Sequence, residues 1–149
     1  MKKEVNVGDI FLIPFENRFA VCKVLWISKR TKNAFSFIVK DELISLSKDG
    51  LSIALKNSNI KLKLFTGIVE VFYTSIEKLS KQAWQIIGNI KLEKEEDNFL
   101  YHNIGGKLFK GDEEIRPLNN EELMSTPKMF IAGYDAIDNF LKMAFNNNN

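Results

Sequence analysis

The sequence has almost none of the two side chains most often used for nucleophilic catalysis and transition-metal binding. Among its 149 residues it has one cysteine, Cys22, and one histidine, His102. A lone cysteine excludes an intramolecular disulfide, and one Cys with one His is too small a set for a typical zinc site. Cys22 lies in an apolar run, which predicts a buried structural thiol. His102 lies in a loop-like segment, which predicts a surface or locally bonded side chain.

Signatures of several enzyme classes are also missing. The chain contains no Gly-x-Ser-x-Gly elbow, no Walker A loop and no Gly-x-Gly-x-x-Gly loop. The acidic run at residues 93–97 lacks the alternating spacing and the glycine of a calcium loop. Its adjacent carboxylates, in a polar run, are a poor general acid–base pair. An enzyme with carboxylates assembled from distant positions stays an alternative. The residues themselves therefore give no support for enzymatic activity, and we expect no cofactor and no metal.

Long hydrophobic runs are absent as well. No apolar run approaches the length of a membrane span, and no apolar segment follows the charged start Met1-Lys2-Lys3-Glu4. Together with the missing disulfide framework, these features predict a cytoplasmic protein without a membrane partner. The chain length predicts one domain, which we place at residues 1–145, with a disordered tail at residues 146–149.

Charge is present but unevenly divided. The formal net charge is +2, yet residues 1–92 carry 15 Lys/Arg and 8 Asp/Glu, a net charge of +7. Residues 93–149 carry 6 and 11, a net charge of −5. An acidic patch attracts a basic partner by steering and complementarity, whereas solvated loops and helix starts are the simpler explanation. If the acids do bind a partner, we expect the contacts from Glu93, Glu95, Glu96, Asp97, Asp112, Glu113 and Glu114.

The opening of the chain predicts a β-hairpin. Two dense apolar runs, residues 9–16 and 18–29, meet at Glu16-Asn17, and both faces of each run are apolar. Such strands lie in the interior of a sheet. Pro14 has no N–H to donate, so it marks an edge or a bulge. Further strands are predicted at residues 34–39, in the β-rich stretch 60–74, and at 84–90, 107–110 and 114–116.

Helices are predicted later in the chain, and Lys48-Asp49-Gly50 reads as a turn. Thr74 and Glu77 have capping-box spacing, with Ile76, Leu79 and Ala83 expected to face inward. Asn119 or Asn120 starts a second helix, with Glu121-Glu122 in its first turn. A last helix runs from Asp135 through Phe145, with an apolar stripe of Ile137, Phe140, Leu141 and Ala144. The predicted fold class is therefore α+β: a bent antiparallel β-sheet or small SH3-like barrel with two or three helices.

A nucleic-acid-binding β-barrel is the alternative function that composition suggests. Phe occurs 12 times, and two of these residues, Phe35 and Phe37, lie near basic side chains of the first three strands. A strand face of this kind could stack bases and contact phosphates. The basic side chains concerned are Lys23, Lys29, Arg30, Lys32 and Lys40. Core filling by Phe and the near-neutral net charge argue against it, so nucleic acid is the less favoured partner.

Two pieces of the chain resemble one protein family. The run Val7–Phe15, with Val24-Leu25 of the next strand, is similar to the start of the immunity protein 26 family. The run Trp84–Leu92 resembles that family's pattern Trp-x-x-Ile-Gly-x-x-x-Leu, although Lys91 stands where members commonly have proline. The resemblance covers the chain up to about residue 100.

Members of this family are predicted to neutralise toxins of bacterial polymorphic toxin systems, to be encoded beside the toxin and to bind it stoichiometrically. The resemblance implies an inhibitor whose partner is a cognate toxin, with a basic nuclease as one class of toxin. The matching residues are structural and carry no toxin specificity: Gly8, Asp9, Pro14, Trp84 and Gly88. The same opening resembles, more distantly, toxin endoribonucleases of the PemK type, whose basic and Ser/Thr catalytic residues are not identifiable here.

Overall fold

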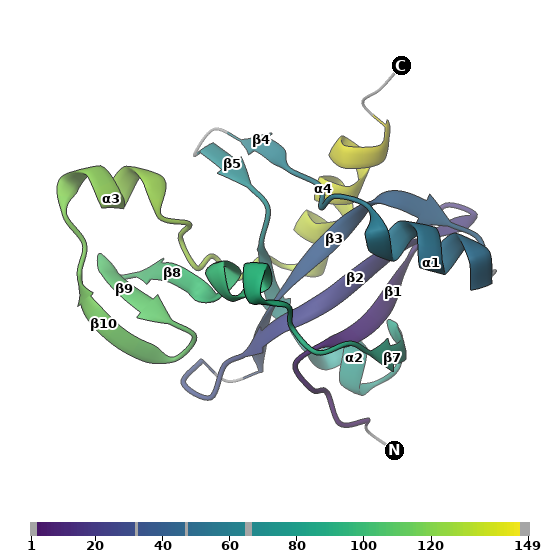
Figure 1. Cartoon of the computed structure of the whole chain (residues 1–149), viewed down its shortest axis with the longest axis horizontal. Helices are drawn as coiled ribbons and strands as arrows, with labels where there is room; N and C mark the ends of the chain where they lie inside the picture. Colours follow the sequence, from purple (N-terminus) through teal and green to yellow (C-terminus); the bar gives the residue numbers. More distant parts are fainter. Residues whose placement is uncertain (1–2, 32, 47, 65–66, 147–149) are drawn as a thin grey trace.

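A computed structural model describes residues 3–31, 33–46, 48–64 and 67–146 of the chain (Figure 1). Within these residues ten strands form three antiparallel sheets, and helices cover the largest sheet. The predicted α+β class is confirmed, and the chain is a single small domain. Of the two predicted forms, the bent open sheet is the observed one, because none of the three sheets closes into a barrel within the described ranges.

The main sheet has five strands in the order β6-β3-β2-β1-β7. Their bounds are β1 (Asp9–Phe15), β2 (Arg18–Ile27), β3 (Ala34–Ile44), β6 (Phe72–Ser75) and β7 (Gln85–Asn89). Strands β1, β2 and β3 form an antiparallel meander, with Phe11 opposite Cys22 and Val24 opposite Phe37. As predicted, β1 and β2 are interior strands. Pro14 is exposed and lies beyond the part of β1 that pairs with β7. Its lack of an N–H therefore costs no hydrogen bond between these two strands.

One face of the sheet carries the main core, which is rich in aromatic side chains. Phe11 stacks on Trp84 with ring centroids 5.7 Å apart and meets Phe37 edge-on at 5.4 Å. Two helices close this face: α2 (Glu77–Ser80) contributes buried Leu79, and α4 (Tyr134–Asn146) contributes residues of its apolar stripe. Offset and edge-on ring pairs of this kind add to the stability gained from burial alone.

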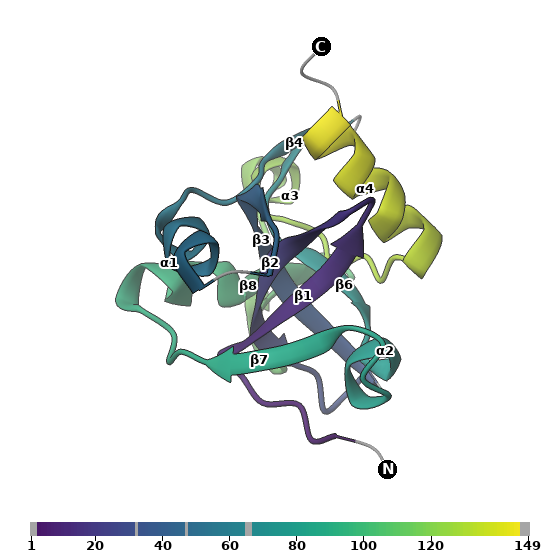
Figure 2. The same ribbon diagram turned by 90° about the vertical axis from the view of Figure 1, so that its right-hand side faces the viewer.

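The opposite face carries two smaller apolar clusters. Helix α1 (Lys48–Lys56) packs Ala54 against Ile10, Leu12, Val21 and Ile44 at one end of the face. At the other end the 3-10 helix η1 (Lys94–Leu100) packs against the cluster around Leu25 and Ile38. Figure 2 shows α1 and α4 on opposite sides of the strands. The region between the two smaller clusters is where charged residues of the sheet gather.

The remaining elements extend from this framework. Strands β4 (Leu62–Leu64) and β5 (Gly67–Val69) form a short hairpin. Strands β8 (Tyr101–Ile104), β9 (Lys107–Lys110) and β10 (Glu113–Pro117) form a three-stranded sheet, followed by helix α3 (Asn120–Ser125). We refer to residues 93–126, from the N-cap of η1 to the C-cap of α3, as the lobe. It lies to one side of the main sheet, on the left in Figure 1.

Several local predictions need correction. The described residues form four α-helices and one 3-10 helix, more than the two or three helices expected. The Lys48-Asp49-Gly50 segment begins α1 rather than a turn, because the apolar residues that follow find a partner surface on the sheet. The stretch 60–74 is β-rich as predicted, and it holds β4, β5 and most of β6.

The predicted capping box at Thr74 is wrong. The Thr74 hydroxyl donates a 2.6 Å hydrogen bond to the carbonyl of Ala132, and Ile76 precedes α2 without a side-chain cap. Leu79 is buried as predicted, but Ala83 is exposed. The Thr74 side chain, which local spacing assigned to a helix cap, therefore makes a tertiary hydrogen bond instead.

The two later helix starts follow the sequence more closely. The Asn119 side chain accepts a 2.9 Å hydrogen bond from the backbone of Glu122, which caps α3 as predicted. Helix α4 buries Ile137 and Leu141. It begins one residue before Asp135 and includes Asn146, so a disordered tail starting at residue 146 is wrong at that residue. Residues 147–149 of the predicted tail lie outside the described residues.

Candidate functional site

The acidic residues singled out in the sequence lie in the lobe, but they do not form one free patch. Glu96 is buried, and its Oε1 makes a 2.7 Å ion pair with the ammonium of Lys23 on β2. The same Oε1 accepts a 2.8 Å hydrogen bond from the backbone N–H of Glu93, which fixes the start of η1. Lys23 also donates to the carbonyl of Lys91 at 3.2 Å. Glu96 therefore joins the lobe to the sheet, and it is not part of an exposed acidic surface.

Asp112 has a similar structural role at the β9–β10 turn. Its carboxylate accepts hydrogen bonds from the Ser28 hydroxyl at 2.8 Å and from the backbone N–H groups of Lys29 and Arg30 at 2.9 and 3.4 Å. Partial burial opposes ionisation, but these donors together hold the pKa of Asp112 below its ordinary value. Asp112 thus holds the β2–β3 turn against the lobe.

The other acidic side chains of the lobe are exposed or half-buried at its surface. Asp97 pairs with Lys110 at 3.2 Å, and Glu114 pairs with Lys107 at 3.4 Å. Arg116 contacts Glu122 and holds the pKa of that carboxyl at about 2. No ion pair is formed within the described ranges by the carboxylates of Glu93, Glu95, Glu113 and Glu121. Within the described part of the chain, these four residues are the carboxylates of the lobe that have neither an ion-pair partner nor the set of hydrogen bonds that holds Asp112.

Large apolar side chains are exposed on the same lobe. Met124 is 89% exposed at the end of α3, and Ile115 on β10 is 45% exposed. The lobe as a whole carries nine Asp/Glu and four Lys/Arg, a net charge of −5. Exposed apolar side chains combined with charged ones are groups that a protein–protein contact can use. The sequence pointed to the acids but not to these two apolar residues, because their exposure depends on how β10 and α3 pack.

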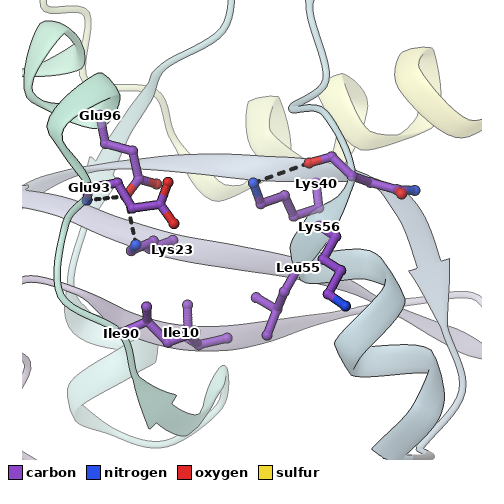
Figure 3. Close-up of a pocket in the computed structure, with 9 residues that line it drawn as sticks. Ile10, Lys23, Lys40, Leu55, Lys56, Ile90, Glu93 and Glu96 are labelled. Atoms are coloured by element: carbon purple, nitrogen blue, oxygen red, sulfur yellow. Dashed lines mark hydrogen bonds and ion pairs between the residues drawn. The ribbon is translucent and has the colours of Figure 1, made fainter.

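A cleft lies where the lobe meets the sheet. It has a volume of about 340 Å³ and is bordered by α1 on one side and η1 on the other (Figure 3). Its lining consists of Ile10, Lys23, Lys40, Leu55, Lys56, Asn57, Ile90, Glu93 and Glu96. The cleft exists because the two apolar clusters on this face stop short of one another. Sequence reasoning missed it, since its residues come from five separate segments.

His102 and Cys22 are both part of the folded interior. The Nε2–H of His102 donates to the carbonyl of Gly111 at 2.9 Å, so its Nδ1 is the acceptor facing the Tyr73 hydroxyl at 3.4 Å. Burial lowers the pKa of His102, although the Gly111 bond and Asp112 oppose the shift. Burial also raises the pKa of the Cys22 thiol. The prediction of a buried Cys22 is confirmed. His102 is hydrogen-bonded, but it lies on β8 and is buried, so the predicted loop-like segment and surface position are wrong.

The basic aromatic face proposed for nucleic acid is not assembled on the described residues. Phe35 and Phe37 are fully buried in the main core, and Lys23 is buried in its ion pair. Arg30 lies over the ring of Phe109 at 4.8 Å from the centroid. Lys32 lies outside the described residues. The two rings expected to stack bases are therefore inaccessible to them.

The residues that carry the family resemblance lie together. Gly8 has a φ of +90°, and a β-carbon there would lie 2.7 Å from the carbonyl of Ile90. Asp9 accepts hydrogen bonds from the backbone of Asn6 at 2.8 Å and from the side chain of Asn89 at 2.9 Å. Gly88 pairs with Ile10 beside a bulge between β1 and β7, where a β-carbon would meet nothing within 4 Å. The two resembling segments are thus hydrogen-bonded neighbours, since β1 pairs with β7.

Comparison of the chain with protein-family models, curated proteins and solved structures finds no match. The resemblance to the immunity protein 26 family therefore rests on its sequence motifs. In the described part of the chain, no group of three or more His, Cys, Asp or Glu is placed to hold a metal ion. None of the helices described there has the length and apolar character needed to cross a membrane.

Proposed function

We propose that this protein is an immunity protein that binds a cognate bacterial toxin stoichiometrically and neutralises it in the cytoplasm, without enzymatic activity of its own. The observation that carries the proposal is the lobe, with its net charge of −5 and its exposed Met124 and Ile115. Such a surface is complementary to a basic protein surface that also has apolar groups. A basic nuclease offers this combination around its substrate groove.

The pairing of β1 with β7 supports the proposal. The segments Val7–Phe15 and Trp84–Leu92 carry the resemblance to the immunity protein 26 family, and they lie side by side in the sheet. Their conformational roles are structural, as the turn at Gly8 and the core position of Trp84 illustrate. Shared segments of this kind belong to a common framework, and toxin specificity then lies outside them.

The contact surface that we propose is narrower than the set of acids in the sequence. Glu96 and Asp112 hold the fold together, so changing them would disturb the protein itself. Glu95 and Glu113 are exposed, with no ion-pair partner in the described ranges. These two residues, together with Met124, are the side chains that we expect the toxin to contact.

The test needs the toxin, which we expect to be encoded by a gene beside the one for this protein. The variant Glu95→Lys/Glu113→Lys reverses two free charges on the lobe. The matched control Glu4→Lys/Asp138→Lys makes the same charge change at two exposed acids outside the lobe. Protection of cells that co-express the toxin is measured for both variants, and binding is measured by calorimetry at low and high salt.

The lobe variant should bind at least roughly tenfold more weakly at low salt, a loss of about 1.4 kcal/mol, whereas the control keeps most of its affinity. The difference between the two should shrink at high salt, because exposed charges are screened. Equal protection and equal affinity of the lobe variant and the control would refute the proposed contact surface. Absence of any neighbouring toxin gene would count against the immunity function itself.

A further inference from the structure

The base of the cleft is built from a buried ion pair. The side chains of Lys23 and Glu96 are only 6% and 11% exposed, and they meet at 2.7 Å. The ion pair and the hydrogen bond of the Glu96 side chain both use Oε1, and Glu96 lines the cleft, so Oε2 remains available as an acceptor. Lys23 uses two of its three donors, on Glu96 and on the Lys91 carbonyl. The base therefore offers one carboxylate oxygen and one ammonium hydrogen to a molecule in the cleft.

The two walls of the cleft carry opposite charges. Lys40 and Lys56 stand on the side of β3 and α1, and Glu93 stands on the side of η1. Figure 3 shows the ammonium of Lys40 directed into the space in front of Glu93 and Glu96. Lys40 donates to the Asn57 carbonyl at 3.3 Å, which positions its ammonium and leaves other donors available. No ion pair joins Lys40 to Glu93 in the described structure. The space between them thus has a positive side and a negative side.

Apolar groups complete the lining. Ile10, Leu55 and Ile90 come from β1, α1 and the residue after β7. The volume of about 340 Å³ lies near the lower end of the range of small-molecule sites, roughly 300–1,000 Å³. A ligand that fits must therefore be small, must carry one anionic and one cationic group, and must have an apolar part.

We propose that the cleft binds a free zwitterion of the aliphatic α-amino-acid class. The ligand's carboxylate faces Lys40, its ammonium faces Glu93 and Glu96, and its side chain lies against Ile10 and Ile90. A ligand with a carboxylate but no ammonium is repelled by the two glutamates, and a ligand with an ammonium but no carboxylate is repelled by the lysines. Each single-charge ligand therefore leaves one wall uncompensated. The proposal does not depend on toxin binding, because it uses the cleft rather than the outer surface of the lobe.

The experiment is a titration of the full chain, followed by two-dimensional NMR of the backbone amides. L-leucine is the probe. The matched compounds are 4-methylpentanoate, which lacks the ammonium, and 3-methylbutylamine, which lacks the carboxylate. We expect saturable shifts at amides of the cleft with leucine, and binding at least about tenfold weaker for each single-charge compound.

Two variants locate the site. Glu93→Gln removes an exposed carboxylate of the cleft but keeps a side-chain oxygen for the capping box at the start of η1. It also leaves the Lys23–Glu96 pair intact, so the protein should fold normally. Glu95→Gln makes the same change two residues away, at a glutamate that does not line the cleft. Leucine binding should weaken about tenfold in the first variant and stay unchanged in the second.

Three results would overturn the proposal. The first is the absence of saturable shifts up to about 10 mM leucine, well above a dissociation constant of about 1 mM. The second is equal binding of leucine and either single-charge compound. The third is equal binding by Glu93→Gln and Glu95→Gln. The toxin-binding proposal would survive each of these results, because its test uses a different surface and a different variant.

Discussion

The buried pair between Lys23 and Glu96 gives the sharpest quantitative prediction. It is the one ion pair of the described residues in which both side chains are nearly inaccessible, at 6% and 11% exposure. Replacing Lys23 with Met leaves the Glu96 carboxylate without its counter-charge beside an apolar face. Loss of one partner of a buried pair costs about 3–5 kcal/mol. Glu96 borders the cleft, where water can reach it, so we expect a value near about 3 kcal/mol for Lys23→Met.

A double-mutant cycle separates the pair from its surroundings. Glu96→Met strands the Lys23 ammonium and should cost about 3 kcal/mol as well, with some further loss from the hydrogen bond to the Glu93 backbone. In the double variant both charges are gone, and the methionines can pack against the neighbouring apolar clusters. That variant should lie within about 1 kcal/mol of the wild-type protein. The two changes would then be strongly non-additive.

The assay is urea denaturation at pH 7, followed by tryptophan fluorescence. The chain has two tryptophans, Trp26 and Trp84, and both are buried, so unfolding changes both environments. Free energies of unfolding are compared at equal m-values, which guards against a change in cooperativity. The reasoning would be refuted if either single variant lost less than about 1 kcal/mol, or if the double variant lost the sum of the two single losses.

Two further predictions concern pH. The pKa of Asp112 is lowered in the folded protein, so its contribution to stability is complete above the unfolded-state value of about 3.9 and is lost as the pH falls through the folded value. Asp112→Asn should cost about 1–2 kcal/mol at pH 7, and the difference from wild type should narrow in urea titrations taken down to low pH, whereas Glu113→Gln should change little. An unchanged difference at low pH would contradict the role of the Asp112 charge. The pKa of His102 is also lowered, so stability should be full above about pH 6.5 and should fall as the pH drops below it. His102→Gln should flatten that part of the pH profile of the unfolding free energy, and an unaltered profile would show that other groups cause it.

Much of the fold was predictable because its signals are local. The apolar runs on both sides of Glu16-Asn17 predicted β1 and β2, and the apolar character of both faces predicted that these strands are interior. The Asn119 cap of α3 depends on residues three positions apart, so it could be read directly. The stripe on α4 has helical spacing, and its Ile137 and Leu141 are buried. In each case the interacting residues are close in the sequence.

Predictions failed where a distant partner changed the role of a residue. Thr74 has the spacing of a helix cap, yet it binds the carbonyl of Ala132 instead. Gly50 lies in a turn-like tripeptide, but the sheet face that α1 covers makes the helix favourable. The acids of the lobe looked alike in the sequence, and only the fold separates buried Glu96 from exposed Glu95.

The sequence alone determined the α+β class, the interior hairpin, the burial of Cys22 and the separation of positive and negative charge along the chain. These properties depend on composition and on spacings of a few residues. The tertiary structure decided which carboxylates are used in folding, where Met124 and Ile115 emerge, and that a cleft with oppositely charged walls opens between α1 and η1. Those properties depend on residues far apart in the sequence. Lys23 and Glu96, for example, are separated by 73 positions and meet only when the lobe packs on the sheet.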